Sequence, residues 1–177
     1  MAPRFHLLLL LQLGCTELTA PPTHGWRVPD SLADAFDAAA TDWCNATEGA
    51  YCPYADEQAE QAITDGSGQP NAEGNCGWYI GADRHIWLHV ASIAAGECPA
   101  FAPDAAACGT DDAVHPPSQS RDCWRVATAT ELVQGVIAHE LGHAAGLAHL
   151  SDPLSLMHRP KWSIRVMRSD AARREGL

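Results

Sequence analysis

The spacing of hydrophobic residues predicts a helix near the start of the folded chain. It begins at Asp30 or Ser31, because either side chain can cap the free N–H groups of a first helical turn. The apolar residues then recur every three or four positions, which places them on one face of the helix. They are Leu32, Ala35, Phe36, Ala39 and Trp43. We expect this face to pack in the core.

A second helix is predicted from Thr128 onwards, where Thr128 and Glu131 form the T-x-x-E pattern of a capping box. Along one face of this helix the side chains change from aliphatic to imidazole, in the order Leu132, Val136, His139 and His143. The residues beside this face are Val133, Ile137 and Leu141. The histidines are therefore expected at the edge of a packed face, where neighbouring side chains hold them in place. A short final helix is predicted after Ser169 and Asp170.

Alternation of apolar and polar residues predicts a strand from Trp78 to Ile93. The apolar positions are Ile86, Leu88 and Val90, and the positions between them are His85, Trp87 and His89. His85 and His89 would lie about 13 Å apart on such a strand, too far to bind one ion. Shorter strands are expected around 51–54 and 123–126. The polar stretch that follows residue 54 and the segment 94–122 have no hydrophobic period, and we expect loops there, the second pinned by disulfides.

The chain has 177 residues, of which 46% are hydrophobic, which suits one domain with a real core. Its formal net charge is −11. Nucleic acids and anionic membrane surfaces are bound by basic patches, so this charge argues against both as partners. We expect a monomer.

Residues 1–15 read as an export signal, with Arg4 at the positive end and an apolar run over residues 5–11. That run is too short to remain as a helix across a bilayer. Leu13-Gly14-Cys15 resembles the end of a bacterial lipoprotein signal, with Cys15 as the lipidated residue. The alternative is an ordinary secretory signal cut between Cys15 and Ala20. We expect a tether over residues 16–29 and one folded domain over residues 30–177.

The cysteine count supports an exported protein. Seven cysteines is an odd number, and setting Cys15 aside as a lipid anchor leaves six that can pair. These are Cys44, Cys52, Cys76, Cys98, Cys108 and Cys123. None has C-x-x-C spacing, so disulfides in an oxidising compartment are favoured over a cysteine zinc site. The sequence does not choose among the pairings.

The segment from His139 to His149 reads H-E-x-x-H-x-x-G-x-x-H. His139 and His143 are four residues apart, so on a helix they share a face and can bind one cation. Gly146 can leave the helix in a left-handed conformation without a Cβ penalty and bring His149 back as a third ligand. Three imidazoles with one open position are typical of catalytic zinc.

This motif resembles that of the metzincin zinc endopeptidases at every specified position. Met157 looks like the methionine of their Met-turn, which forms an apolar floor beneath the metal. The resemblance implies an α+β fold: a mixed twisted sheet, a backing helix, an active-site helix, the Met-turn and a short C-terminal helix. Leu150 and Arg159 depart from the subgroup patterns, so no subgroup is assigned.

The resemblance also implies a zinc-dependent endopeptidase with one catalytic ion. His139, His143 and His149 would bind the zinc, and Glu140 would act as the general base toward the attacking water. Substrates would be proteins or peptides. The alternative is a zinc-binding envelope lipoprotein or interaction module without turnover. Residues 65–75 hold several oxygen ligands, but their spacing fails the EF-hand pattern, and a solvated loop is favoured over a structural calcium site.

Overall fold

The computed structural model of the protein describes residues 24–67, 76–98, 101–103, 124–151 and 155–158. The strands are β1 (Gly25–Arg27), β2 (Tyr54–Ala55), β3 (Gln61–Asp65), β4 (Gly77–Ile80), β5 (His85–Leu88), β6 (Phe101–Pro103) and β7 (Trp124–Val126). The helices are the 3-10 turn η1 (Asp30–Leu32), α1 (Ala33–Ala46), α2 (Val90–Ala94) and α4 (Ala129–Ala144). The predicted α+β fold is confirmed.

The main sheet of the fold has five strands, in the order β2-β1-β3-β5-β4. Neighbouring strands are parallel except β4, which pairs antiparallel with β5 at one edge. The strands β6 and β7 form a separate antiparallel pair. The sheet is therefore mixed, as the sequence predicts.

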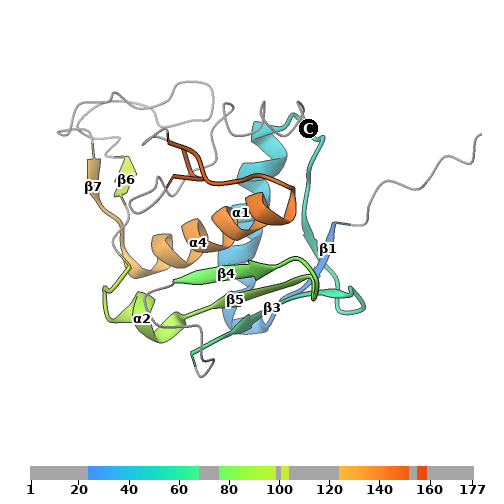
Figure 1. Ribbon diagram of the computed structural model, residues 1–177, viewed down its shortest axis with the longest axis horizontal. Coiled ribbons are helices and arrows are strands. Elements are labelled where there is room, and N and C mark those ends of the chain that lie inside the picture. Colours follow the sequence, from blue (N-terminus) through green and yellow to red (C-terminus); the bar gives the residue numbers. More distant parts are fainter. Residues whose placement is uncertain (1–23, 68–75, 99–100, 104–123, 152–154, 159–177) are drawn as a thin grey trace, which may run out of the picture.

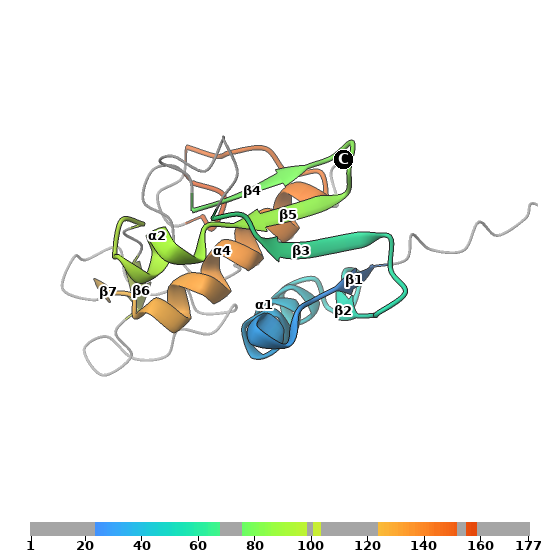
Figure 2. The same ribbon diagram turned by 90° about the horizontal axis from the view of Figure 1, so that it is seen from below.

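The helices α1 and α4 pack against each other, and α4 also lies against β4 and β5 (Figure 1). The core between them contains Ile63, Ile86 and Leu88 from the sheet and Phe36 and Ile137 from the helices, all almost fully buried. Seen from below, β3, β5 and β4 lie in front of α4, while α1 lies to one side, next to β1 and β2 (Figure 2). The central position of α4 explains why this helix can present a rigid site.

The start of the folded region differs from the prediction. Gly25–Arg27, which the sequence assigned to the tether, form β1 between β2 and β3, and Trp26 is buried in the core. A strand of three residues is too short to show an alternating pattern, so nothing in the sequence marked it. The first helix also begins differently. Asp30–Leu32 form η1, α1 starts at Ala33, and neither helix start has a side-chain cap hydrogen bond.

The strand predicted from Trp78 to Ile93 is wrong as one element. It consists of β4 and β5 joined by a turn in which Arg84 has a positive φ of 49°. The His89 N–H still donates to the Cys76 carbonyl, but the chain then leaves the sheet because Val90 begins α2. Val90 continues the apolar alternation, but helical backbone follows it.

The remaining predictions have mixed outcomes. The strand around 123–126 is confirmed as β7, and the one around 51–54 is displaced to Tyr54–Ala55. The loop after it contains a strand that the sequence missed, β3, because its flanking residues are polar and only Ala62 and Ile63 are buried. The final helix after Ser169 lies outside the described residues.

Two disulfides join four of the six candidate cysteines, Cys44 with Cys52 and Cys76 with Cys98. Cys15, Cys108 and Cys123 lie outside the described residues. Both bridges fit an oxidising compartment. In the described part of the chain, no helix has the length and apolar character needed to cross a membrane.

Candidate metal centre

The helix α4 ends in hydrogen bonds that turn the chain back toward its own last turn. The Leu147 N–H donates to the Gly142 carbonyl and the Gly146 N–H to the His143 carbonyl, the pair of bonds that defines a Schellman motif. Gly146 has a φ of +93°, the left-handed conformation predicted for it. This turn brings His149 back toward the helical histidines, as the sequence predicts.

Three imidazoles converge at this turn. The Nε2 atom of His149 lies 3.2 Å from Nε2 of His139 and 3.1 Å from Nε2 of His143. All three ligand atoms lie within 4.8 Å of one another, and no other His, Cys, Asp or Glu of the described residues joins the group. His139 is buried, His143 half-buried and His149 exposed, so the site opens to solvent on the side of His149.

The hydrogen bonds of the rings show that this cluster suits a cation. Nδ1 of His139 lies 2.7 Å from the Leu156 carbonyl, and Nδ1 of His143 lies 2.7 Å from the Leu147 carbonyl. A carbonyl only accepts, so each Nδ1 carries the proton and each neutral ring directs an Nε2 lone pair toward His149. One proton on His149 could satisfy only one of these lone pairs at a time, whereas a metal ion can accept all three. The residues therefore fit a zinc ion bound through Nε2.

Met157 is a fully buried side chain that packs against α4. A Cβ added to Gly142, between Glu140 and His143, would lie 2.5 Å from the Met157 sulfur. The backbone around Met157 is fixed by two hydrogen bonds: Leu150 N–H donates to the Met157 carbonyl, and Met157 N–H donates to Ser155 Oγ. The segment therefore holds the Met157 sulfur against α4 at Gly142, next to His143.

Glu140 follows His139 on α4 and is 4% exposed. Its carboxylate does not belong to the cluster of ligand atoms. A carboxylate beside the imidazoles, but not among them, can act on a water molecule rather than hold the ion.

Two buried donors that the sequence did not single out contact the backbone of α4. Trp43 Nε1 donates to the Ala138 carbonyl at 2.8 Å, and the Tyr51 hydroxyl donates to the Leu141 carbonyl at 3.2 Å. The sequence identified Trp43 only as a core residue and Tyr51 only as a strand residue. No repeating pattern in the sequence predicts hydrogen bonds between residues that are so far apart in the chain.

His85 and His89 are not members of this cluster. His85 is on β5, and its Nε2 lies 2.9 Å from Thr64 Oγ1. Burial, and next the positive charge of Arg27, lower the pKa of His85. His89 precedes α2 instead of continuing the strand.

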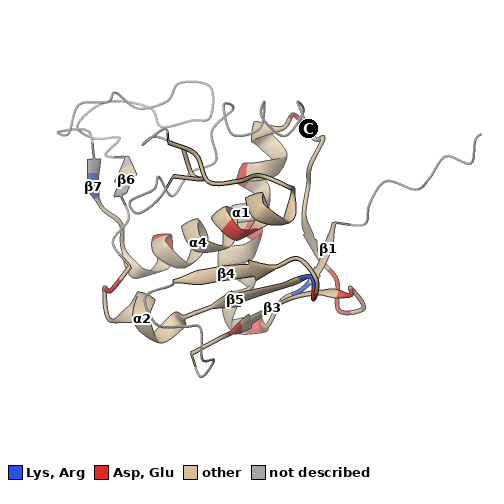
Figure 3. Ribbon diagram, in the orientation of Figure 1, with Lys and Arg blue, Asp and Glu red and all other residues tan. Residues whose placement is uncertain are grey.

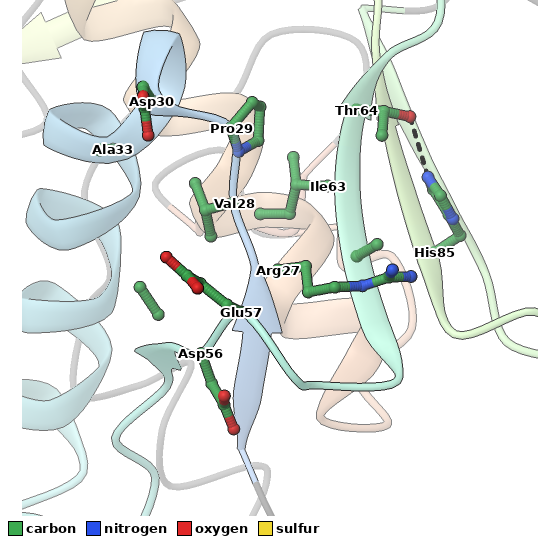
Figure 4. A pocket seen from close by; sticks show the side chains of 12 residues that line it. Arg27, Val28, Pro29, Asp30, Ala33, Asp56, Glu57, Ile63, Thr64 and His85 are labelled. Carbon is green, nitrogen blue, oxygen red and sulfur yellow. Dashed lines mark hydrogen bonds between the residues drawn. The ribbon is translucent and has the colours of Figure 1, made fainter.

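Arg27, Thr64 and His85 line a cavity of about 640 Å³ between the start of α1 and the sheet (Figure 4). Asp30, Asp56 and Glu57 also line it, so the cavity combines charges of both signs. None of the three clustered histidines borders it. Figure 3 shows further acidic residues along α1 and α4. The cavity is separate from the metal centre.

The geometry of the centre agrees with a comparison against protein families, in which residues 34–171 match the model of the matrixins. The chain belongs to the matrixin family. It is therefore a metzincin-type metalloendopeptidase, a hydrolase whose substrates are proteins or peptides and whose histidine triad supplies the zinc ligands of this family. The match also decides the subgroup that Leu150 and Arg159 had left open. No curated protein and no solved structure matches the chain.

Proposed function

We propose that this matrixin cleaves peptide bonds with one zinc ion held by His139, His143 and His149 and with Glu140 as the general base. The observation that carries the proposal is the convergence of three Nε2 atoms, two of them on rings whose Nδ1 atoms face backbone carbonyls. Zinc, when bound, supplies a Lewis acid that polarises a carbonyl and lowers the pKa of water.

Residues of the chain would orient the ligands, transfer the proton and leave space for the substrate. The Leu156 and Leu147 carbonyls hold two imidazoles in one orientation, so the ligands need little rearrangement. Glu140, which is buried beside the ligands, would accept a proton from the attacking water on its carboxylate and return it to the departing amine. The exposed side of the cluster, at His149, leaves room for a peptide to approach.

Replacing Glu140 tests this assignment. Glu140→Ala should keep about one zinc ion per chain, because the three ligands remain, while peptide cleavage falls by about 10²–10⁴-fold. His143→Ala should lose both zinc and activity. Glu60→Ala is the matched control, since Glu60 is an exposed carboxylate paired with Arg84, and it should change neither quantity. Metal analysis and cleavage of a diverse peptide library measure both effects.

Two results would contradict the proposal in different ways. A wild-type protein that holds zinc tightly but cleaves no peptide would support the alternative, a zinc-binding module without turnover. A Glu140→Ala variant as active as wild type would show that another group is the base.

We also propose that the protein is exported and anchored in the cell envelope through a lipid on Cys15. The support is the Leu13-Gly14-Cys15 pattern together with two disulfides in the folded part. Wild-type protein should fractionate with membranes, and Cys15→Ser should release it. Soluble wild-type protein that begins after Cys15 would show free secretion instead.

A further inference from the structure

The backbone of α4 accepts two hydrogen bonds from side chains outside the helix, on either side of its catalytic dipeptide. Ala138, which accepts from Trp43 Nε1, directly precedes His139. Leu141, which accepts from the Tyr51 hydroxyl, directly follows Glu140. Carbonyls three residues apart lie on the same side of a helix, so both bonds act on one side of α4.

Both bonds are buried and hold the helix at a close approach. Trp43 is fully buried, and Tyr51 is 3% exposed. The Leu141 carbonyl also accepts the helical bond from the Ala145 N–H, so the Tyr51 hydroxyl uses its second lone pair. A Cβ on Gly142 would lie 3.1 Å from Trp43 Cζ2, which shows how closely α1 and α4 approach at this level.

One short loop, closed by a disulfide, links the two donors. Trp43 precedes Cys44 and Tyr51 precedes Cys52, and these cysteines form a disulfide. Within the loop, Thr47 Oγ1 lies 2.7 Å from the Trp43 carbonyl and accepts a hydrogen bond from the Tyr51 N–H at 2.9 Å. The rings of Trp43 and Tyr51 also meet edge to face, with centroids 5.7 Å apart. The spacing between the two donors is therefore fixed.

We propose that Trp43 and Tyr51 are positioning residues that set the rotation and axial position of α4, with the Cys44–Cys52 disulfide fixing the spacing between them. They are not members of the imidazole cluster, and they act through the backbone that carries His139 and Glu140. Packing alone does not require the Tyr51 hydroxyl, because phenylalanine would fill nearly the same volume. The idea rests on the proposed function in that it names Glu140 as the group to be aligned.

Tyr51→Phe removes one hydroxyl and keeps the ring, so it isolates the positioning bond. A displacement of about 1 Å at a catalytic group can cost about 100-fold in rate, and we expect kcat to fall by about 10-fold or more. KM should change by less than about twofold, since the bond acts on the reacting groups and not on substrate binding. Trp43→Phe, which removes the other donor, should act in the same direction. Tyr54→Phe makes the same chemical change on a half-exposed tyrosine and should leave kcat unchanged.

The metal centre provides a readout that does not depend on turnover. The full chain loaded with Co²⁺ instead of zinc should show an altered ligand-field absorption spectrum in Tyr51→Phe and in Trp43→Phe, but not in Tyr54→Phe. If either variant unfolds at a lower temperature yet keeps the wild-type spectrum and kcat, its role is only structural and the proposal is overturned. A rise in KM alone would also overturn it. If wild type cleaves nothing, the proposed function fails, but the spectrum still tests the positioning.

The disulfide is tested by a double-mutant cycle. Cys44→Ser with Cys52→Ser should lower kcat, and adding Tyr51→Phe should lower it by less than the product of the separate effects, because all act through the same bonds. Independent, multiplying effects would show that the disulfide does not act through Tyr51.

Discussion

Two glycines near the metal centre are required for different physical reasons. Gly146 has a positive φ, which a residue with a Cβ adopts only at a cost, and the sequence motif marks it. Gly142 lies within α4, where alanine would normally be preferred, and the motif does not specify it. It is needed because the Met157 sulfur and the Trp43 ring lie where its Cβ would be.

Gly142→Ala should therefore destabilise the protein, whereas replacing a helical glycine by alanine usually stabilises it. In an open helix, alanine stabilises by up to about 1 kcal/mol relative to glycine. Here the added methyl overpacks a buried site, a change that costs about 1–3 kcal/mol, so the free energy of unfolding should fall. Denaturant unfolding measures it. The loss should be smaller in a Met157→Ala background, and an equal loss there would show that Met157 is not the obstacle.

At the scale of elements, α4 is well terminated at both ends. Thr128 Oγ1 accepts from the Glu131 N–H, and the Glu131 carboxylate accepts from the Thr128 N–H, so the predicted capping box is confirmed. Arg125 from β7 donates to the same carboxylate at 2.8 Å. The Schellman motif closes the other end at Gly146. His139 and His143 thus lie on a helix with both ends fixed.

The capping box should make stability depend on acid pH. Hydrogen bonds from Arg125, and then from Thr128, lower the pKa of Glu131 from 4.5 to about 2. Because the folded value is depressed, this stabilisation is fully present above the unfolded pKa and is lost as pH falls toward about 2. Denaturant unfolding between these pH values measures the loss. Glu131→Gln can still cap but cannot ionise, and a variant with the same acid dependence as wild type would contradict the assignment.

At the scale of the whole molecule, disulfides hold segments that the sheet and helices leave apart. Cys44–Cys52 closes the end of α1, and Cys76–Cys98 joins the residue before β4 to the chain after α2. The second bridge spans 22 residues and encloses the β4–β5 hairpin and α2.

Mature protein should contain three disulfides and no free thiol apart from any at Cys15. Two of the bridges are those described, and the third would join Cys108 to Cys123, the remaining candidates. Thiol labelling under denaturing conditions, with and without reduction, counts them. Removing Cys76–Cys98 should lower the free energy of unfolding by about 3 kcal/mol. Several free cysteines in the oxidised protein would contradict an exported, disulfide-bonded fold.

The predictions that the structure confirms concern interactions between residues close together in the sequence. The ligand spacing of His139 and His143, the left-handed Gly146 and the capping box at Thr128 all depend on residues within about one helical turn of each other. Interactions over such distances are encoded by neighbouring residues, so a motif can display them. The same reasoning fails for β1 and β3, because a short strand is stabilised by its partners in the sheet rather than by its own pattern.

Sequence by itself therefore determined which atoms can bind the metal, and tertiary structure decided what holds those atoms in place. Trp43 and Tyr51 reach Ala138 and Leu141 across separations of 95 and 90 residues. Contacts of this kind form only when α1 packs on α4, because packing brings a buried donor to a carbonyl and removes competing water. Each of the two helices could be predicted from its own apolar stripe. The distance and rotation at which they pack against each other could not.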